Sequence, residues 1–256
     1  MKILSILNQK GGVGKTTTAI NLSAQFAKNG LRTLAIDLDP QANLTVVLSG
    51  GQFEFLTTIS DIFDSPKKHP IKNSIIEARA KDKAIPNLSL VPTDISLSRV
   101  IEKSLTKIHR ERILLRQLES IKDDFDIVVL DCPPNLSLTS VNAMMASDMF
   151  LIPVDGGSFS LNGLADLLDA LEEVKETEDI NFAVFRNEYA KSNKLINNFL
   201  DEQLEELKEQ VLTSTVRRTE AIGQASVSCE PLQTFKPSST AINDYKSLAK
   251  EILNRI

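Results

Sequence analysis

Aromatic residues and cysteines are scarce in this sequence. It has no tryptophan, and aromatic residues make up only 5% of its 256 residues. A core with so few aromatics must be built mainly from Ile, Leu, Val and Ala, as buried parallel strands and their covering helices usually are. The two cysteines, Cys132 and Cys229, lie far apart and form no C-x-x-C pair. This argues against a disulfide framework and against a zinc or iron–sulfur site, and indicates reduced cysteines in a cytosolic protein.

Long apolar runs and an excess of positive charge are missing as well. No stretch approaches the ~20 apolar residues that a membrane span needs. The apolar run after Met1-Lys2 ends too early for a signal peptide, so we expect a cytoplasmic protein. A net charge of -5 with a pI near 5.3 argues against a surface that is basic throughout and binds nucleic acid as a whole. One local basic patch is compatible with this charge.

Short apolar runs alternate with longer helical patterns, which is typical of βαβ units on a mostly parallel sheet. The pattern predicts strands over 2–7, 32–38, 88–91, 125–130, 149–154 and 181–185, and helices over 16–28, 58–63, 95–101, 110–122, 161–175, 194–208 and 240–255. Residues 50–83 are less periodic and indicate surface insertions without a legible function. No linker, repeat or low-complexity tail divides the chain, so we predict a single α/β domain over 1–256, a mostly parallel twisted sheet flanked by helices.

A glycine-rich segment, Lys10-Gly-Gly-Val-Gly-Lys-Thr-Thr17, directly follows the first predicted strand. Its glycines let successive backbone N–H groups point inward at the positive end of the following helix, which makes a nest for anions. Lys15 would place an ammonium against the β- and γ-phosphates of a triphosphate, and the Thr16 hydroxyl would take a Mg²⁺ position. A plain glycine turn is the alternative interpretation, but a chance match of this length between a strand and a helix is rare.

The general P-loop pattern asks for glycine at position 9, where this sequence has Gln9. The lysine before the glycines instead makes this the deviant Walker motif, and the chain resembles the ParA/Soj/MinD family of ATPases along essentially its whole length. The resemblance implies a SIMIBI-type P-loop NTPase that hydrolyses ATP with Mg²⁺, slowly without a partner. The residues it implies for nucleotide binding in this segment are Lys10, Gly11, Gly12, Val13, Gly14, Lys15, Thr16 and Thr17.

Two aspartates follow predicted strands. Asp39 comes after the second strand and Asp131 after the buried strand at 125–130. Carboxylates at the carboxyl ends of neighbouring parallel strands converge on one crevice, where Mg²⁺ and an attacking water need acidic partners. Either residue alone could be an ordinary strand-end aspartate. The resemblance implies that Asp39 positions or activates the water and that Asp131 supports Mg²⁺, generally through water, with Asp37 in a supporting or structural role. It makes Lys10, Lys15 and Asp39 the catalytic residues, and Thr16, Asp39 and Asp131 the metal site.

Two further roles follow from the resemblance. It implies that Lys10 reaches across an ATP-dependent sandwich homodimer to the phosphates in the other subunit, although a solvated lysine beside a loop is the simpler alternative. It places adenine recognition near Arg186 and Asn187, and near Phe235 and Pro237. A solvated strand end is the alternative interpretation of Arg186 and Asn187.

The ParA/Soj members of the family resemble this chain most. They imply a nucleoid-associated protein that coats DNA nonspecifically and is stimulated by a ParB-like or cargo-adaptor partner. The implied use is plasmid or chromosome partition, or the positioning of a protein assembly. A few cations suffice for nonspecific DNA binding, and the candidates are Arg217, Arg218, Lys236 and Lys246. Except for the arginine pair, scattered solubilising charges explain them equally well.

Two alternatives remain open, and a third is excluded by the cysteines. A MinD-like protein would bind membrane through a C-terminal amphipathic helix, but residues 241–256 fit a core-facing stripe and lack a strongly basic face, so membrane binding is the second choice. A nitrogenase-like reductase would need cluster cysteines that Cys132 and Cys229 do not supply. An assembly scaffold would use ATP only as a conformational ligand, with negligible turnover.

Overall fold

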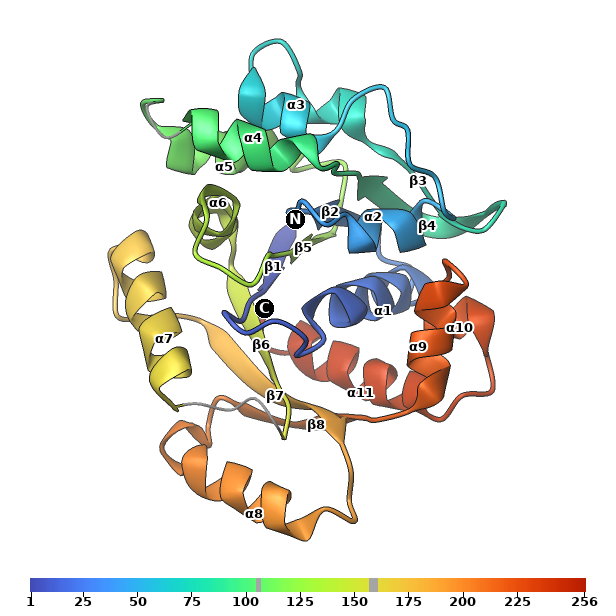
Figure 1. The fold of residues 1–256 in the computed structure, drawn as a ribbon, viewed down its shortest axis with the longest axis vertical. Helices are drawn as coiled ribbons and strands as arrows, with labels where there is room; N and C mark the ends of the chain where they lie inside the picture. Colours follow the sequence, from blue (N-terminus) through green and yellow to red (C-terminus); the bar gives the residue numbers. More distant parts are fainter. Residues whose placement is uncertain (105–106, 157–160) are drawn as a thin grey trace.

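One sheet runs through the middle of the structure (Figure 1). The computed structural model describes residues 1–104, 107–156 and 161–256. The strands are β1 (Lys2–Ile6), β2 (Thr33–Asp37), β3 (Ile76–Ala80), β4 (Lys83–Val91), β5 (Ile127–Asp131), β6 (Met149–Val154), β7 (Phe182–Tyr189) and β8 (Val211–Arg217). Their order is β3-β4-β2-β5-β1-β6-β7-β8, and neighbours are parallel except for β3 and β4. The predicted α/β class with a mostly parallel sheet is confirmed.

Helices cover both faces of this sheet (Figure 1). They are α1 (Lys15–Lys28), α2 (Asn43–Leu48), α3 (Ile59–Asp64), α4 (Ser96–Lys103), α5 (Ile113–Glu119), α6 (Leu138–Ala146), α7 (Leu161–Lys175), α8 (Lys194–Gln203), α9 (Glu220–Val227), α10 (Leu232–Phe235) and α11 (Ala241–Leu253), with single turns η1 (Ile71–Ser74), η3 (Arg110–Arg112) and η4 (Glu205–Leu207). One core layer packs α1, α2 and α9 to α11, and the other packs α3 to α7. Within the described residues, no helix has the length and apolar character to cross a membrane.

The central strands are buried on both sides, and their side chains alternate between the two core layers. Leu4 and Ile6 of β1 enter one layer and Ile3 enters the other, because successive side chains of a strand point to opposite faces. β2, β5 and β6 are buried along their whole length. This rigid centre fixes the carboxyl ends of β1, β2 and β5, where the glycine-rich segment, Asp39 and Asp131 begin.

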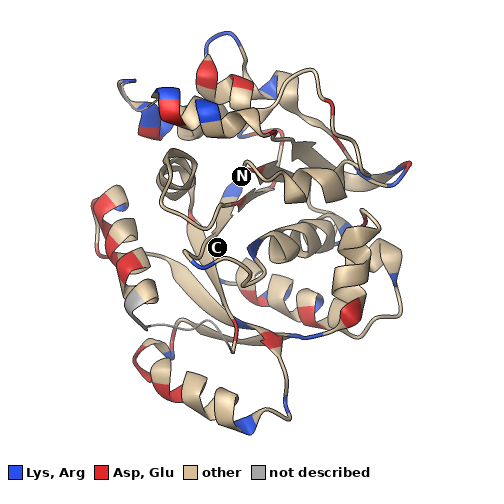
Figure 2. Ribbon diagram, viewed as in Figure 1, with Lys and Arg blue, Asp and Glu red and all other residues tan. Residues whose placement is uncertain are grey.

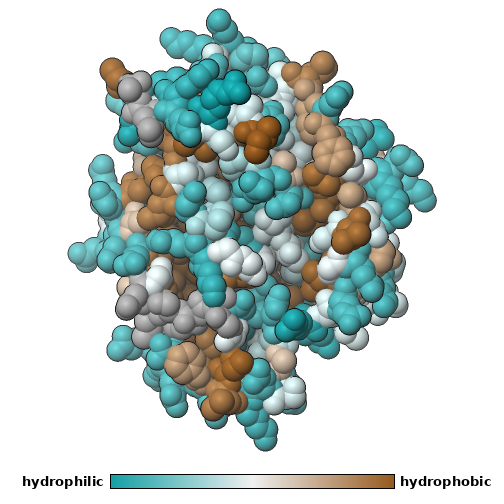
Figure 3. All heavy atoms as spheres, viewed as in Figure 1, coloured by the Kyte–Doolittle hydropathy of each residue, from teal (hydrophilic) through white to brown (hydrophobic). Residues whose placement is uncertain are grey.

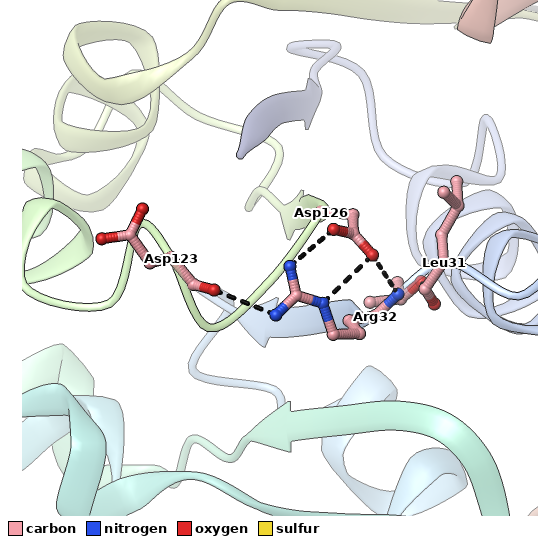
Figure 4. Close-up of polar contacts among 5 residues, drawn as sticks. Leu31, Arg32, Asp123 and Asp126 are labelled. Atoms are coloured by element: carbon pink, nitrogen blue, oxygen red, sulfur yellow. Dashed lines mark hydrogen bonds and ion pairs between the residues drawn. The ribbon is translucent and has the colours of Figure 1, made fainter.

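An ion pair holds β2 and β5 together at the opposite end of the sheet (Figure 4). The guanidinium of Arg32 forms a 2.7 Å contact with Asp126 and donates to the Asp123 carbonyl at 2.9 Å, while the Arg32 backbone N–H also donates to Asp126. The hydrogen bonds from Arg32 lower the pKa of Asp126 to about 2. The contact is exposed, so its main effect is on geometry: it aligns the two strands whose other ends carry the aspartates.

The strand β8 lies at an edge of the sheet, and the last helix covers its free backbone groups. Glu251 of α11 accepts hydrogen bonds from the backbone N–H groups of Thr213 and Ser214, both at 2.9 Å. Asp244 accepts one from the Arg217 N–H at 3.1 Å. Burial would raise the pKa of Glu251, but the hydrogen bonds from Ser214 and Thr213 outweigh it and lower the pKa. The carboxylates thus satisfy donors that would otherwise invite pairing with another chain.

The structure differs from the sequence-based expectations in several elements. Residues 50–83, expected to be surface insertions, contain α3, η1 and the edge strand β3. The segments that form α6 and β8 were not predicted as helix and strand. The helix expected over 110–122 is a turn of η3 followed by the shorter α5, and the one expected over 194–208 ends at Gln203. Apart from α6, which packs against the central strand β1, these departures lie toward the periphery, and the central strands are as predicted.

Candidate functional site

The glycine-rich loop, residues 7–14, joins β1 to α1 at the carboxyl edge of the sheet. Gly12 and Gly14 have φ angles of 81° and 87°, in the left-handed region where a side chain is strained. Gly14 also lies against another strand, because a Cβ built on it would be 2.1 Å from Nδ2 of Asn187. The first turn of α1 contains no acidic residue, so the positive end of its dipole is free to attract an anion.

Lys15 closes the loop from the inside. The residue is only 7% exposed, and its Nζ donates a 2.8 Å hydrogen bond to the carbonyl of Lys10 at the start of the loop. Burial lowers the pKa of Lys15, while the carboxylates of Asp131 and Asp39 act in the opposite direction. A partly desolvated ammonium in a ring of backbone donors is stabilised by any anion that enters the loop.

Asp131 carries a buried carboxylate that has no hydrogen-bond partner among the described residues. It ends β5, beside Asp37 at the end of β2, and neither of its oxygens accepts a hydrogen bond from the described residues. Burial, followed by the charge of Asp37, raises its pKa well above the ordinary value. The Thr16 hydroxyl lies near enough to lower that pKa, although the geometry between them falls short of a hydrogen bond. An acceptor in this position needs a donor such as a metal-bound water.

Asp37 has a structural role, in agreement with the supporting role expected for it. It is fully buried, and its carboxylate accepts hydrogen bonds from the Thr45 N–H and hydroxyl, both at 2.8 Å, and from the Asp39 N–H at 3.1 Å. Burial raises its pKa to about 7 against the effect of these hydrogen bonds. The carboxylate therefore shapes the turn after β2 and holds Asp39 at the carboxyl edge.

Asp39 and Lys10 lie at more accessible positions of the same edge. Asp39 is half-buried and accepts a 2.9 Å hydrogen bond from the Gln41 N–H, which leaves acceptor capacity on its carboxylate. Lys10 is exposed, and its backbone N–H donates to the side chain of Asn8. Asn8 in turn donates to the Pro153 carbonyl at 2.8 Å, which ties the loop to β6.

The donor set of this edge fits a magnesium ion bound together with phosphates. Among the described residues there is no group of three or more His, Cys, Asp or Glu side chains that could hold a metal by itself. Mg²⁺ usually keeps several waters and takes only one or two protein oxygens beside phosphate oxygens. Thr16 and the unpartnered Asp131 provide this kind of sparse oxygen environment at the mouth of the loop.

A pocket of about 520 Å³ opens beside the loop. Gly12, Gly14 and Thr17 form one wall, and the end of β7, the end of β8 and α9 form the others. Asn187 lines the pocket and donates a 2.9 Å hydrogen bond to the Val13 carbonyl. The residues of the far wall that sequence reasoning missed are Glu188, Thr219, Glu220, Ile222, Gly223 and Ser226. The cap of α9 at Thr219 followed by Glu220 was a readable helix start, but nothing local indicated that it faces the loop.

The structure separates the other adenine candidates from this pocket. Arg186 precedes Asn187 in β7 and so faces the opposite side, where it pairs with Asp201 of α8 and lines a different cavity. Phe235 packs half-buried against the core, and Pro237 is exposed; neither lines the pocket beside the loop. Of the four residues predicted near adenine, only Asn187 adjoins the glycine-rich loop.

The four DNA candidates also differ in their surroundings. Arg217 is half exposed, but its guanidinium forms two contacts with Asp244, at 2.6 and 2.7 Å, and is therefore held in an ion pair within the chain. Arg218 is 79% exposed, with Glu188 at 3.8 Å. Lys236 and Lys246 are exposed. In the view of Figure 2, basic positions are spread over the molecule and interspersed with acidic ones.

Comparison with known proteins decides the family. Residues 1–184 match the family described as AAA domain. The chain is 32% identical over 256 residues to the sporulation initiation inhibitor protein Soj of Bacillus subtilis, which covers 98% of each chain. It is also 32% identical over 263 residues to the chromosome partitioning protein ParA of Caulobacter vibrioides, across 100% of this chain and 95% of the relative. The chain belongs to the ParA/Soj/MinD family of P-loop ATPases.

A solved structure extends the likeness to the whole fold. Cobyrinic acid a,c-diamide synthase of Mycobacterium smegmatis, with bound ATP analog and magnesium, superposes with a TM-score of 0.82 at 23% identity, over 99% of this chain and 95% of that one. The predicted family and fold are thus confirmed. In this ParA/Soj/MinD-family chain, the two lysines of the motif lie at opposite ends of the glycine-rich loop, Lys10 exposed and Lys15 buried.

Proposed function

We propose that residues 1–256 act as a single ATPase domain that binds ATP with Mg²⁺ and dimerises in the ATP-bound state. The observation that carries this proposal is the convergence of buried Lys15 and the unpartnered carboxylate of Asp131 on the mouth of a loop lined with backbone donors. The backbone N–H groups of residues 11–17 and Lys15 would hold the phosphates. Thr16, with Asp131 acting through water, would hold Mg²⁺, which supplies positive charge against the phosphates.

Different residues of the chain would have different roles in binding and hydrolysing ATP. Asp39 has a half-buried carboxylate with acceptor capacity to spare, so it would accept a hydrogen bond from the attacking water and orient it. Lys10 is exposed at the same edge, and it would meet phosphates bound by the partner subunit. Asn187 supports adenine binding next to the loop, since it lines the adjoining pocket. Hydrolysis would then remove the charge that draws the subunits together and loosen the dimer.

We further propose that the ATPase moves or spaces a cargo on DNA, in the nucleoid of the cytoplasm, with a ParB-like or cargo-adaptor partner. The similarity to the chromosome partitioning protein ParA of Caulobacter vibrioides supports this assignment. A membrane role is less well supported, because α11 packs Tyr245, Leu248 and Ile252 into the core and offers no apolar face to a lipid surface. Whether the cargo is a plasmid, a chromosome or a protein assembly depends on the partner.

Four measurements on the full chain test this function. Light scattering with and without ATP and Mg²⁺ should show an ATP-dependent dimer. The dimer should be retained on random-sequence DNA and should not float with liposomes. ATP hydrolysis should rise when DNA and the partner are added. A protein that remains monomeric with ATP contradicts the proposed dimer, flotation favours a membrane role, and hydrolysis that stays flat with DNA and partner favours a scaffold.

A further inference from the structure

A groove of about 400 Å³ lies between α6, α7 and η3, and it shares no lining residue with the pocket beside the glycine-rich loop. Its apolar lining includes Leu136, Val141, Met145 and Val174. Leu136 is 46% exposed, and the other three are partly exposed. Figure 3 shows apolar atoms on this side of the molecule, flanked by hydrophilic ones. A methionine in the lining can adapt its shape to an inserted side chain.

The rim of the groove is acidic. Glu111, Glu173 and Glu176 line it, against a single base, Arg112. Glu173 and Glu176 are exposed, and neither forms an ion pair with any described residue. Apolar lining and an acidic rim together select for an occupant that carries an apolar side chain among positive charges.

The outer face of α7 extends this negative charge. Asp166, Asp169 and Glu172 are exposed and, in the part of the chain that the structure describes, have no cationic partner. The only base of the helix, Lys175, turns inward and donates to the Ser147 carbonyl at 2.6 Å. Figure 2 shows the acidic positions along α7. Helix neighbours three positions apart, such as Asp166 and Asp169, lie ~5–6 Å apart, within a Debye length of ~8 Å at physiological ionic strength, and act jointly on a bound cation.

The groove is connected to the candidate active site through one short segment. Residues 132–137 join Asp131 to α6, and Leu136 of this segment is part of the groove lining. The Ser140 hydroxyl of α6 donates to the Asn135 carbonyl at 2.6 Å, so the segment and the helix are held together. An occupant that contacts Leu136 and α6 therefore bears directly on the segment that follows Asp131.

We infer that the groove between α6 and α7 is the docking surface for a protein segment in which Lys or Arg residues surround one or two apolar side chains. The apolar side chains pack between Val141 and Met145, and the cations meet Glu173 and Glu176. A second copy of this chain, with its net charge of -5, and an anionic membrane would both be repelled by the acidic rim. The groove would be the surface that the activating partner contacts. The inference rests on the proposed function only in its claim that the bound segment stimulates ATP hydrolysis.

The first test uses a short fluorescent peptide in which lysines surround two leucines. One matched peptide has serines in place of the leucines, and another has glutamates in place of the lysines. Fluorescence anisotropy with the full chain, without nucleotide, should show binding of the lysine–leucine peptide and binding about tenfold weaker or less for both controls. Equal binding of the serine peptide would overturn the role of the apolar groove.

Charge-reversal variants locate the surface. The exposed pair Glu173→Lys with Glu176→Lys should weaken binding of the lysine–leucine peptide by about tenfold. The matched pair Glu202→Lys with Glu206→Lys, on the exposed surface of α8 and η4, should leave it unchanged. Equal losses in both pairs, or no loss in the first, would show that the peptide does not use this groove. If dimerisation or vesicle binding is lost only in the variant with Glu173→Lys and Glu176→Lys, the groove binds a second copy of the chain or a membrane. Either result would overturn the inference.

A variant of the glycine-rich loop separates this inference from the proposed function. Lys15→Ala should weaken ATP binding by about tenfold or more and retain peptide binding, because Lys15 does not line the groove. Peptide addition should also stimulate ATP hydrolysis by the unaltered chain. If the peptide fails to bind while ATP binds, the inference is contradicted and the proposed function remains. If ATP fails to bind the unaltered chain while the peptide binds, the proposed function is contradicted and the docking surface remains.

Discussion

The side chain of Asn187 donates a 2.9 Å hydrogen bond to the Val13 carbonyl, although 174 positions separate the two residues. The contact joins the end of β7 to the glycine-rich loop, and Asn187 itself is only 7% exposed. Its Nδ2 occupies the space that a Cβ on Gly14 would need. The shape of the loop therefore depends on the second half of the chain as well as on its own glycines.

Replacing Gly14 by alanine should destabilise the fold and weaken nucleotide binding. The methyl group would collide with Asn187, and the residue would be held at a φ of 87°. Strain of this kind costs about 1–3 kcal/mol. Urea unfolding measures the loss of stability, and a nucleotide titration measures the loss of affinity. Gly11→Ala is the stability control, because an added Cβ there meets nothing within 4 Å. Equal unfolding midpoints for the two variants would contradict the contact.

Replacing Asp39 by alanine should remove hydrolysis and preserve the ATP-dependent dimer. Loss of a group that orients the attacking water should slow turnover by roughly 10²-fold or more. Phosphate release from the dimeric variant, with light scattering to confirm dimerisation, measures both properties in one sample. Asp39→Asn is the matched variant, since it keeps the side-chain size and an acceptor for the Gln41 N–H. Turnover at the unaltered rate would show that another residue orients the water.

Replacing Glu251 by glutamine should lower the free energy of unfolding in a pH-dependent way. The carboxylate accepts from two backbone N–H groups of β8, and losing its charge should cost about 1 kcal/mol at neutral pH. Its pKa is lowered in the folded state, so its contribution is present above the unfolded-state value of 4.5 and is lost as the pH falls through the lower folded-state pKa.

Unfolding curves measured at neutral and acid pH test how the contribution of Glu251 to the free energy of unfolding depends on pH. The difference between the unaltered chain and Glu251→Gln should shrink below pH 4.5. Glu202→Gln is the control, because Glu202 is exposed and lies outside the β8 contact. A difference that stays constant down to acid pH would mean that the charge of Glu251 does not stabilise β8.

The two neighbouring arginines should respond differently to replacement by alanine. Arg218 is mostly exposed, so Arg218→Ala should weaken retention on DNA and reduce the dependence of log affinity on log salt by about one. Arg217→Ala should mainly lower the free energy of unfolding, by about 1 kcal/mol, because Asp244 loses its ion pair. Lys72→Ala is the control, because Lys72 of η1 is exposed and pairs only with the exposed Asp124 among the described residues. An unchanged salt dependence for Arg218→Ala would exclude Arg218 from DNA contact.

The centre of the fold could be predicted from sequence because its signals are local. Ile127 to Asp131 form a continuous apolar run that ends in a carboxylate, and residues 10–17 carry glycines between a strand and a helix. By contrast, the middle of β8 is a run of Thr and Ser, and the N–H groups of Thr213 and Ser214 are satisfied by Glu251, 38 and 37 positions away. No local pattern predicts such a partner.

The part of the candidate site around the glycine-rich loop could also be predicted from local sequence signals. Lys15, Thr16 and Asp131 lie together at the mouth of the loop, as their positions after parallel strands indicated. Strand alternation alone indicates that Arg186 and Asn187 have different surroundings, since adjacent residues of β7 face opposite sides. The wall formed by α9 depends on the path of the chain after β8, which only the tertiary structure gives.

The most direct measurement is a calorimetric titration of the full chain with a non-hydrolysable ATP analogue in the presence of Mg²⁺. The account predicts saturable binding to one site per chain, and affinity at least about tenfold lower for Lys15→Ala, whose ammonium is the cation buried in the loop. No binding by the unaltered chain, or equal affinity for the two proteins, would contradict it.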